Sequence, residues 1–175
     1  HNPVPWNGIK LIRGDGIAFP EDQVHQIQQR YYDKQFNVCD SLGVGSLSQN
    51  GQTHAVHIEA VLRLCDKDLI ASKKFKVVLD SINGAGCTVS AQLMERLGCE
   101  LIHLNNEPNG LFAHTPEPTA ENLAELGPEI NKHSADIGFA QDPDADRLAL
   151  IDENGTYIGE EYTLALAAKY IFSKQ

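Results

Sequence analysis

The chain has 175 residues, of which 42% are hydrophobic and 22% charged, and its formal net charge is −10. This composition is ordinary for a folded globular protein and differs from that of disordered or membrane chains. No apolar run approaches the ~20 residues that a membrane-spanning helix needs. The negative charge argues against nucleic acid or an anionic membrane as a partner. An anionic substrate would therefore need positive charge supplied locally.

The four cysteines are scattered along the chain and form no Cys-x-x-Cys pair. Neither a zinc site nor a redox motif is therefore indicated, because both need cysteines at short, fixed spacings. Reduced thiols are the expected state, which is usual in the cytoplasm.

The first fifty residues predict a small unit followed by a linker. Short apolar runs at 9–12 and 17–19 flank a Gly-containing turn and predict a hairpin. Pro20 precedes two acidic residues, which is typical of a helix start, and the helix is expected to reach about Lys34. Residues 36–53 are rich in Gly, Ser, Asn and Gln and predict a linker.

The remainder predicts an α/β unit, in which buried strands alternate with helices. Strands are predicted at 75–80, where Val77–Leu79 form the continuous apolar core typical of parallel sheets, and at 101–104 and 137–140. Asn154-Gly155 separates two further short runs and is a strong hairpin signal, so the edge strand is expected to be antiparallel.

Helices are predicted between and after these strands from the spacing of apolar residues. The first begins near His54, with Val56, Ala60 and Leu64 on one face. The others are expected at 87–97, at 119–126, for one or two turns after Gly127-Pro128, and at 160–172.

The turn Ser81–Gly86 joins the first predicted strand to the next helix and resembles a phosphate cradle. Val89, however, stands where the dinucleotide fingerprint needs a third small residue, and the Gly-Lys-Ser/Thr of a P-loop is absent. A tight strand-to-helix turn is therefore favoured over direct anion binding.

The most informative stretch is Gln141–Arg147, which carries an Asp at every second position between two apolar runs. Loops at strand ends are where α/β proteins place their ligands. Three carboxylates so close together repel one another unless a cation neutralises them. Mg²⁺ is the simplest such cation, since it prefers oxygen ligands and commonly acts beside a phosphate. Arg147 offers a planar guanidinium suited to that phosphate.

Three other interpretations of the acidic loop remain open. It could be a solvated turn without a ligand, because Asp is favoured in turns. It could be an EF-hand with Glu153 at the twelfth position, although Arg147 stands where that loop needs Gly and the flanks predict strands. It could also carry an aspartyl-phosphate, because a carboxylate at the end of a buried strand can be a nucleophile.

Three segments resemble the α-D-phosphohexomutases, which interconvert hexose 1-phosphates and 6-phosphates. His1–Pro3 with Trp6–Lys10 is similar to the end of the family's active-site loop and the Asn-Gly-x-Lys that follows it. Asp80 with Asn83–Gly86 resembles the opening turn of the family's second domain. Asp142–Arg147 resembles the family's metal loop, with Pro143 and Ala145 in place of glycine, which should stiffen it.

The resemblance implies a Mg²⁺-dependent phosphoglucosamine, phosphomannose or phosphoglucose mutase that works through a phosphoserine. By position, the Ser would precede His1, and His1 would lie beside this nucleophile. Lys10 matches a lysine placed for acid/base help or charge neutralisation at the reacting oxygen. Arg147 would contact phosphate. The implied Mg²⁺ ligands are the three loop carboxylates, Asp142, Asp144 and Asp146.

The resemblance also implies a domain organisation. Residues 1–47 would be the end of domain I and a linker, 48–159 domain II with the metal loop, and 160–175 the start of domain III. The expected fold class is α/β, with a mixed, mainly parallel sheet flanked by helices and preceded by a partial α/β domain. The expected partners are a hexose phosphate, with glucosamine or mannose phosphate favoured, and the remaining domains of the enzyme. The expected location is the cytoplasm, and the chain alone is expected to be inactive.

Overall fold

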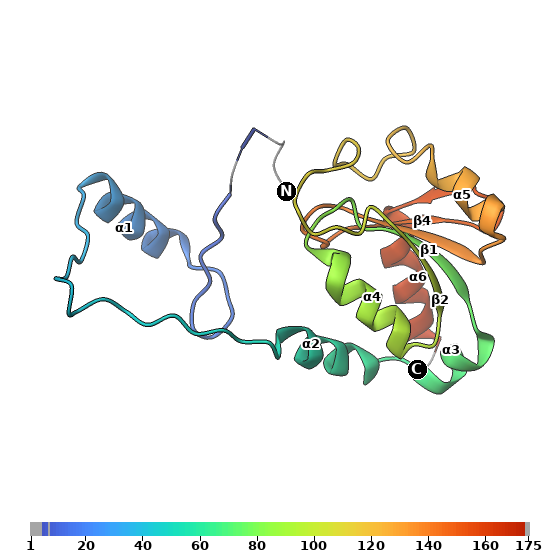
Figure 1. Ribbon diagram of the computed structural model, residues 1–175, viewed down its shortest axis with the longest axis horizontal. Coiled ribbons are helices and arrows are strands. Elements are labelled where there is room, and N and C mark those ends of the chain that lie inside the picture. Colours follow the sequence, from blue (N-terminus) through green and yellow to red (C-terminus); the bar gives the residue numbers. More distant parts are fainter. Residues whose placement is uncertain (1–4, 7, 174–175) are drawn as a thin grey trace. The chain divides into compact units, whose positions relative to one another are not determined.

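The computed structural model describes residues 5–6 and 8–173 (Figure 1). They form two compact units, which meet in sequence between Asn50 and Gly51. The unit that begins at Gly51 contains all five strands of the described chain. No helix in the described part is long and apolar enough to cross a bilayer.

Among its described residues, the N-terminal unit contains one helix, α1 (Glu21–Tyr32), which begins after Pro20 as predicted. The predicted hairpin before it is reduced to a single antiparallel bridge between Ile12 and Ala18. Two short strands are marginal without a layer to pack against, and the apolar residues here are largely exposed, Ile9 by 87%. Residues 36–52 contain neither helix nor strand, as expected for the predicted linker at 36–53, whose last residue belongs to α2 (Thr53–Leu62).

The sheet of the second unit has the strand order β2-β1-β3-β4-β5. Its strands are β1 (Lys76–Asp80), β2 (Glu100–Leu104), β3 (Ile137–Gln141), β4 (Leu148–Ile151) and β5 (Tyr157–Gly159). β1 is parallel to both β2 and β3, whereas β4 is antiparallel to β3 and β5 is antiparallel to β4. The predicted mixed α/β sheet with an antiparallel hairpin is therefore confirmed.

Helices cover both faces of this sheet. They are α2 (Thr53–Leu62), α3 (Lys67–Lys73), α4 (Gly86–Arg96), α5 (Leu126–His133) and α6 (Glu161–Phe172). α5 packs against β1 and β3, α4 against β2 and α2, and α6 against β4 and β5. The core on the α5 side consists of Val78, Leu123, Leu126, Ile130, Ala135, Ala140, Ala149 and Ile151. Val77 and Leu79 point to the opposite face and are also buried, which requires the second helical layer.

Two of the helix predictions were wrong, and α3 was not predicted. α2 buries Ile58 and Leu62 rather than the predicted face, since Val56 is 68% exposed. This helix is apolar on several sides, so spacing alone does not select the buried face. The predicted helix at 119–126 is a series of turns, and α5 begins at Leu126 with Pro128 inside its first turn. A proline is tolerated there because the first amides of a helix have no partner within it.

The side of α2 that faces the core can be tested by two substitutions. Ile58→Ala should lower the free energy of unfolding by about 2–4 kcal/mol, because it empties a buried site. Val56→Ala, at an exposed position of the same helix, should change it by less than about 0.5 kcal/mol. Urea unfolding of the two variants measures both values, and equal losses would contradict this orientation of α2.

Candidate functional site

The acidic loop lies between β3 and β4, at the carboxyl end of β3. The carboxyl ends of parallel strands are the place where α/β sheets bind ligands. Ala145 holds a left-handed backbone conformation in the loop, with φ of 60°. A residue with a Cβ is rare there and costs on the order of 1 kcal/mol. Contacts with the rest of the protein therefore hold the loop in an energetically unfavourable backbone conformation.

Asp142 organises the loop from inside. Its side chain is buried, and Oδ1 accepts hydrogen bonds from the backbone N–H groups of Asp146 and Arg147, each at 3.1 Å. Oδ2 accepts from the Arg147 Nε, also at 3.1 Å. Burial alone would raise the pKa of Asp142, but the Arg147 backbone and side chain outweigh it and hold the pKa below its ordinary value.

The other two acidic residues of the loop, Asp144 and Asp146, are exposed. One carboxylate oxygen from each of the three aspartates lies within 4.8 Å of the others. Oxygens that share an octahedral Mg²⁺ at about 2.1 Å lie roughly 3.0–4.2 Å apart. A small closure of the loop would therefore bring the three oxygens to the spacing that a shared ion needs. The structure thus brings the three predicted ligands together with donors that suit Mg²⁺. That they bind a metal ion stays a prediction.

Arg147 is held between two carboxylates. Besides its contact with Asp142, its Nη1 lies 3.7 Å from Oε2 of Glu160, the residue before α6. This oxygen is buried and accepts no hydrogen bond from the described residues. Sequence reasoning missed Glu160, because nothing in its local pattern separates it from an ordinary acidic residue at a helix start.

The turn Ser81–Gly86 packs against the acidic loop and does not form a phosphate cradle. Three consecutive backbone N–H groups, those of residues 83, 84 and 85, donate to the carbonyl oxygens of Asn105, Ser81 and Pro143. Amides that already have protein acceptors cannot also surround an anion. The interpretation as a tight strand-to-helix turn is therefore the one that the geometry supports.

Two other interpretations of the acidic loop fit the structure poorly. An EF-hand loop is flanked by helices, whereas this loop joins strands β3 and β4, and Glu153 lies beyond β4. A solvated turn without further function would leave its side chains in water, whereas Asp142 is 1% exposed.

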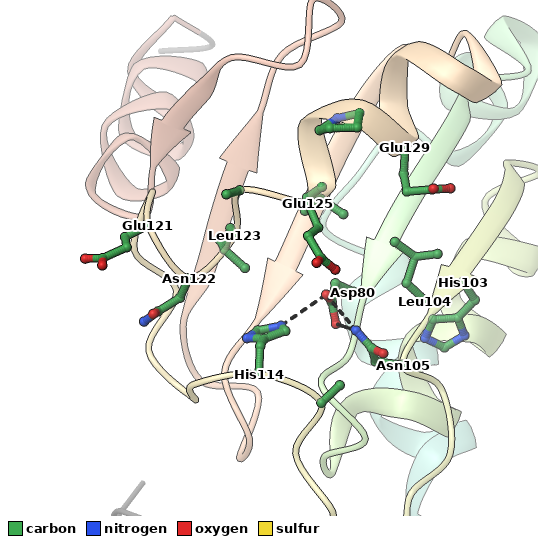
Figure 2. Close-up of a pocket in the computed structure, with 14 residues that line it drawn as sticks. Asp80, His103, Leu104, Asn105, His114, Glu121, Asn122, Leu123, Glu125 and Glu129 are labelled. Carbon is green, nitrogen blue, oxygen red and sulfur yellow. Dashed lines mark hydrogen bonds and ion pairs between the residues drawn. The ribbon is translucent and has the colours of Figure 1, made fainter.

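Asp80, the last residue of β1, carries a second buried carboxylate. Because β1 is parallel to its neighbour β3, this carboxylate lies at the same end of the sheet as the acidic loop. Its oxygens accept from Asn105 Nδ2 at 3.0 Å and from the Ile82 backbone N–H at 2.8 Å, and Oδ2 lies 3.1 Å from His114 Nε2. Asp80, Asn105 and His114 border a hollow of about 890 Å³. In Figure 2, Asn105 and His114 flank Asp80, and the side chain of Glu125 points toward Asp80.

Asp80 and His114 stabilise each other in their charged forms. The hydrogen bond to Asp80 raises the pKa of His114 above its ordinary value, and burial only partly opposes this. Burial opposes ionisation of Asp80, but hydrogen bonds from His114, Asn105 and Ile82 hold its pKa below the ordinary value. His114 thereby anchors the long loop 105–118. Loops of this length are often functional.

The remaining predicted site residues lie near the N-terminus. His1 lies outside the described residues. Lys10 is exposed and belongs to the N-terminal unit. The roles of both residues therefore stay predictions.

Comparisons with known proteins agree on one group of enzymes. A family model described as phosphoglucomutase/phosphomannomutase, alpha/beta/alpha domain II, matches residues 55–155. The chain is 37% identical to a probable phosphoglucosamine mutase of Methanosarcina barkeri, over 97% of this chain and 38% of that protein. It is also 37% identical to a probable phosphoglucosamine mutase of Pyrococcus horikoshii, over 99% of this chain and 38% of that protein.

A solved structure shares the fold. It is a phosphoglucomutase/phosphomannomutase family protein of Burkholderia thailandensis, with a TM-score of 0.69 and 30% identity over 91% of this chain and 33% of that one. The chain thus spans about 38% of the length of the curated relatives and a third of this structure.

Removing one exposed carboxylate should weaken metal binding. Asp144→Asn is expected to raise the Kd for Mn²⁺, a probe for Mg²⁺, by tenfold or more, because it removes a charged oxygen ligand. Electron paramagnetic resonance of free Mn²⁺ measures this constant. The control is Glu153→Gln, an exposed acid that lies at the twelfth EF-hand position and should leave the Kd within about twofold. A larger effect of Glu153→Gln than of Asp144→Asn would favour the EF-hand after all.

The Asp80–His114 pair should make stability depend on pH. The contribution of His114 is fully present below pH 6.5 and is lost as pH rises through its raised folded-state pKa. The contribution of Asp80 is present above pH 3.8 and is lost as pH falls through its lowered pKa. Between these values His114→Gln should cost about 2 kcal/mol, and the cost should shrink at alkaline pH.

Urea unfolding at several pH values measures this cost. His133→Gln removes a more exposed histidine that pairs with Glu129 and should cost less than about 0.5 kcal/mol at every pH. A cost of His114→Gln that does not change with pH would show that the pair is not charged.

Proposed function

Because the chain belongs to the phosphoglucomutase/phosphomannomutase family, we propose that it holds the metal site of a phosphosugar mutase. The enzyme would move a phosphoryl group between O1 and O6 of a hexose phosphate. The observation that carries the proposal is the convergence of the Asp142, Asp144 and Asp146 carboxylates beside Arg147. The donor set consists of oxygen atoms alone, which suits Mg²⁺.

The residues of the acidic loop would have distinct tasks. In phosphoryl transfer the protein mainly positions the reactants and stabilises charge, and a bound Mg²⁺ would supply much of that stabilisation. The carboxylates of Asp144 and Asp146 would hold the ion at the surface of the loop. Asp142 would do so from inside, while it also orients the Arg147 guanidinium through Nε. Arg147 would then contact the substrate phosphate through its planar guanidinium.

The N-terminal residues complete the proposal. Lys10 would assist proton transfer or neutralise charge at the reacting oxygen, and His1 would lie beside a phosphoserine that precedes it. The proposed organisation assigns residues 1–47 to the end of domain I, 48–159 to domain II and 160–175 to the start of domain III. The partners would be the other domains of the enzyme and the sugar phosphate. The names of the relatives support glucosamine, mannose or glucose phosphates as candidates.

Two other functions make different predictions for the same loop. A Ca²⁺-binding module would show micromolar Ca²⁺ affinity and no effect of Mg²⁺. An aspartyl-phosphate enzyme would use one carboxylate as the nucleophile, most naturally Asp142 at the strand end. The burial of Asp142 and the hydrogen bonds that it accepts from Asp146 and Arg147 argue against this, because a nucleophile needs access to the phosphorus atom.

A coupled mutase assay tests the proposed function. This chain alone should show no turnover of glucosamine, mannose or glucose phosphates, with catalytic bisphosphate present, whereas a longer parent with the phosphoserine and all domains should turn over one of them. The reason is geometric, because a misplacement of ~1 Å between the reacting groups can cost on the order of a hundredfold. Turnover by this chain at the rate of the parent would refute the phosphoserine assignment.

Substitutions in the parent extend the same assay. Arg147→Lys should lower kcat/KM by about a hundredfold, because lysine cannot reproduce the planar guanidinium. Glu161→Gln, an exposed position at the start of α6, should change it by less than about twofold. Equal effects of the two substitutions would argue against a contact between Arg147 and the phosphate.

A further inference from the structure

The turn between β1 and α4 contacts both residues that flank Asp142. On one side it meets Pro143, whose carbonyl oxygen accepts from the Ala85 backbone N–H at 2.8 Å. A Cβ added to Gly84 would lie 2.5 Å from that oxygen and 2.9 Å from the Pro143 Cα. Because both are backbone atoms, a larger residue at position 84 would push the acidic loop away.

On the other side the turn meets the side chain of Gln141, the last residue of β3. Gln141 Oε1 accepts from the hydroxyl of Ser81 at 3.0 Å and from that of Ser90, on α4, at 3.2 Å. Both serines are buried. A Cβ added to Gly86 would overlap Oε1, so the amide can keep this position only beside a glycine.

A third strand joins this network. His103, on β2, places its Nε2 2.8 Å from the Ser81 hydroxyl oxygen. A hydroxyl has one hydrogen. If Ser81 donates it to Gln141, its oxygen accepts from His103 Nε2–H. The side chain of Gln141 is therefore held by residues from the β1–α4 turn, from α4 and, through Ser81, from β2.

We infer that Gln141 is a positioning residue for the metal ligand Asp142, and that Gly84 and Gly86 are small in order to permit it. The inference rests on the proposed metal site. Asp142 follows Gln141 directly, so a shift of the Gln141 backbone would move the ligand as well. Groups that hold a ligand in place commonly change metal affinity by 10–100-fold when they are altered.

A role confined to folding makes a different prediction. Hydrogen bonds that only stabilise the core would lower the unfolding midpoint when they are lost and leave metal affinity unchanged. A positioning role changes two further quantities. They are the Kd for Mn²⁺ and the hydrogen exchange of the Asp146 and Arg147 amides, which both donate to Asp142.

The experiment measures both quantities on the 175-residue chain and three variants. Gly86→Ala should displace the Gln141 amide, raise the Kd for Mn²⁺ about tenfold and speed exchange of the two amides. Gln141→Ala should have a similar effect. The double variant should be no worse than Gln141→Ala alone, because the shortened side chain no longer collides with the added methyl group.

The control is Gly127→Ala, in α5. Its added Cβ would lie 2.5 Å from the carbonyl oxygen of Gly155, in the β4–β5 turn. It should lower the unfolding midpoint while the Kd for Mn²⁺ stays within twofold of wild type. An equal loss of affinity in Gly127→Ala would show general destabilisation and overturn the inference.

Two results separate the inference from the proposed function. Wild-type affinity and unchanged amide exchange in Gly86→Ala and Gln141→Ala would overturn the inference and leave the metal site standing. Absence of Mn²⁺ binding by the wild-type chain would refute the metal site. The amide exchange alone would then decide whether Gln141 positions Asp142: faster exchange in Gly86→Ala and Gln141→Ala would support it, and unchanged exchange would refute it.

Discussion

A buried carboxylate at the end of β3, that of Asp142, accepts hydrogen bonds from two backbone N–H groups and from the side chain of Arg147. Leaving such a charge without partners inside the protein would cost several kcal/mol. The loop therefore closes around it, with Ala145 in a left-handed conformation. This closure places Asp144 and Asp146 at the surface of the loop. The candidate metal site is thus a consequence of how the loop supplies hydrogen bonds to the buried carboxylate of Asp142.

The same physical arrangement occurs at the neighbouring strand. Asp80 ends β1 as Asp142 follows β3, and each carboxylate meets a cationic side chain from later in the chain, His114 or Arg147. The two partners differ in what they anchor. His114 ties down the long loop 105–118, and Arg147 closes the acidic loop itself. Histidine can lose its charge near neutral pH whereas arginine cannot, so only the first pair is expected to respond to pH.

Glu160 extends the site beyond the acidic loop. It lies immediately before α6 and approaches Arg147 from outside the strands that frame the loop. Its contact therefore couples the orientation of the guanidinium to the placement of α6 against β4, where the Thr163 hydroxyl donates to the Leu148 carbonyl oxygen at 2.6 Å. An effect on Arg147 can thus arise from changes in this helix as well as in the loop.

The sequence by itself determined the strands, the β4–β5 hairpin and the position of the acidic loop, because these depend on apolar runs and turn residues that are neighbours in the chain. It missed α3, although Asp66 accepts from the Leu69 backbone N–H as a helix cap, a signal that was there to find. Only the tertiary structure decided which face of α2 is buried and that the first predicted hairpin forms a single bridge. It also decided that the Ser81–Gly86 turn packs against the acidic loop. Those features depend on contacts between residues far apart in sequence, such as Gly84 with Pro143, and no local pattern encodes which distant surface a residue will meet.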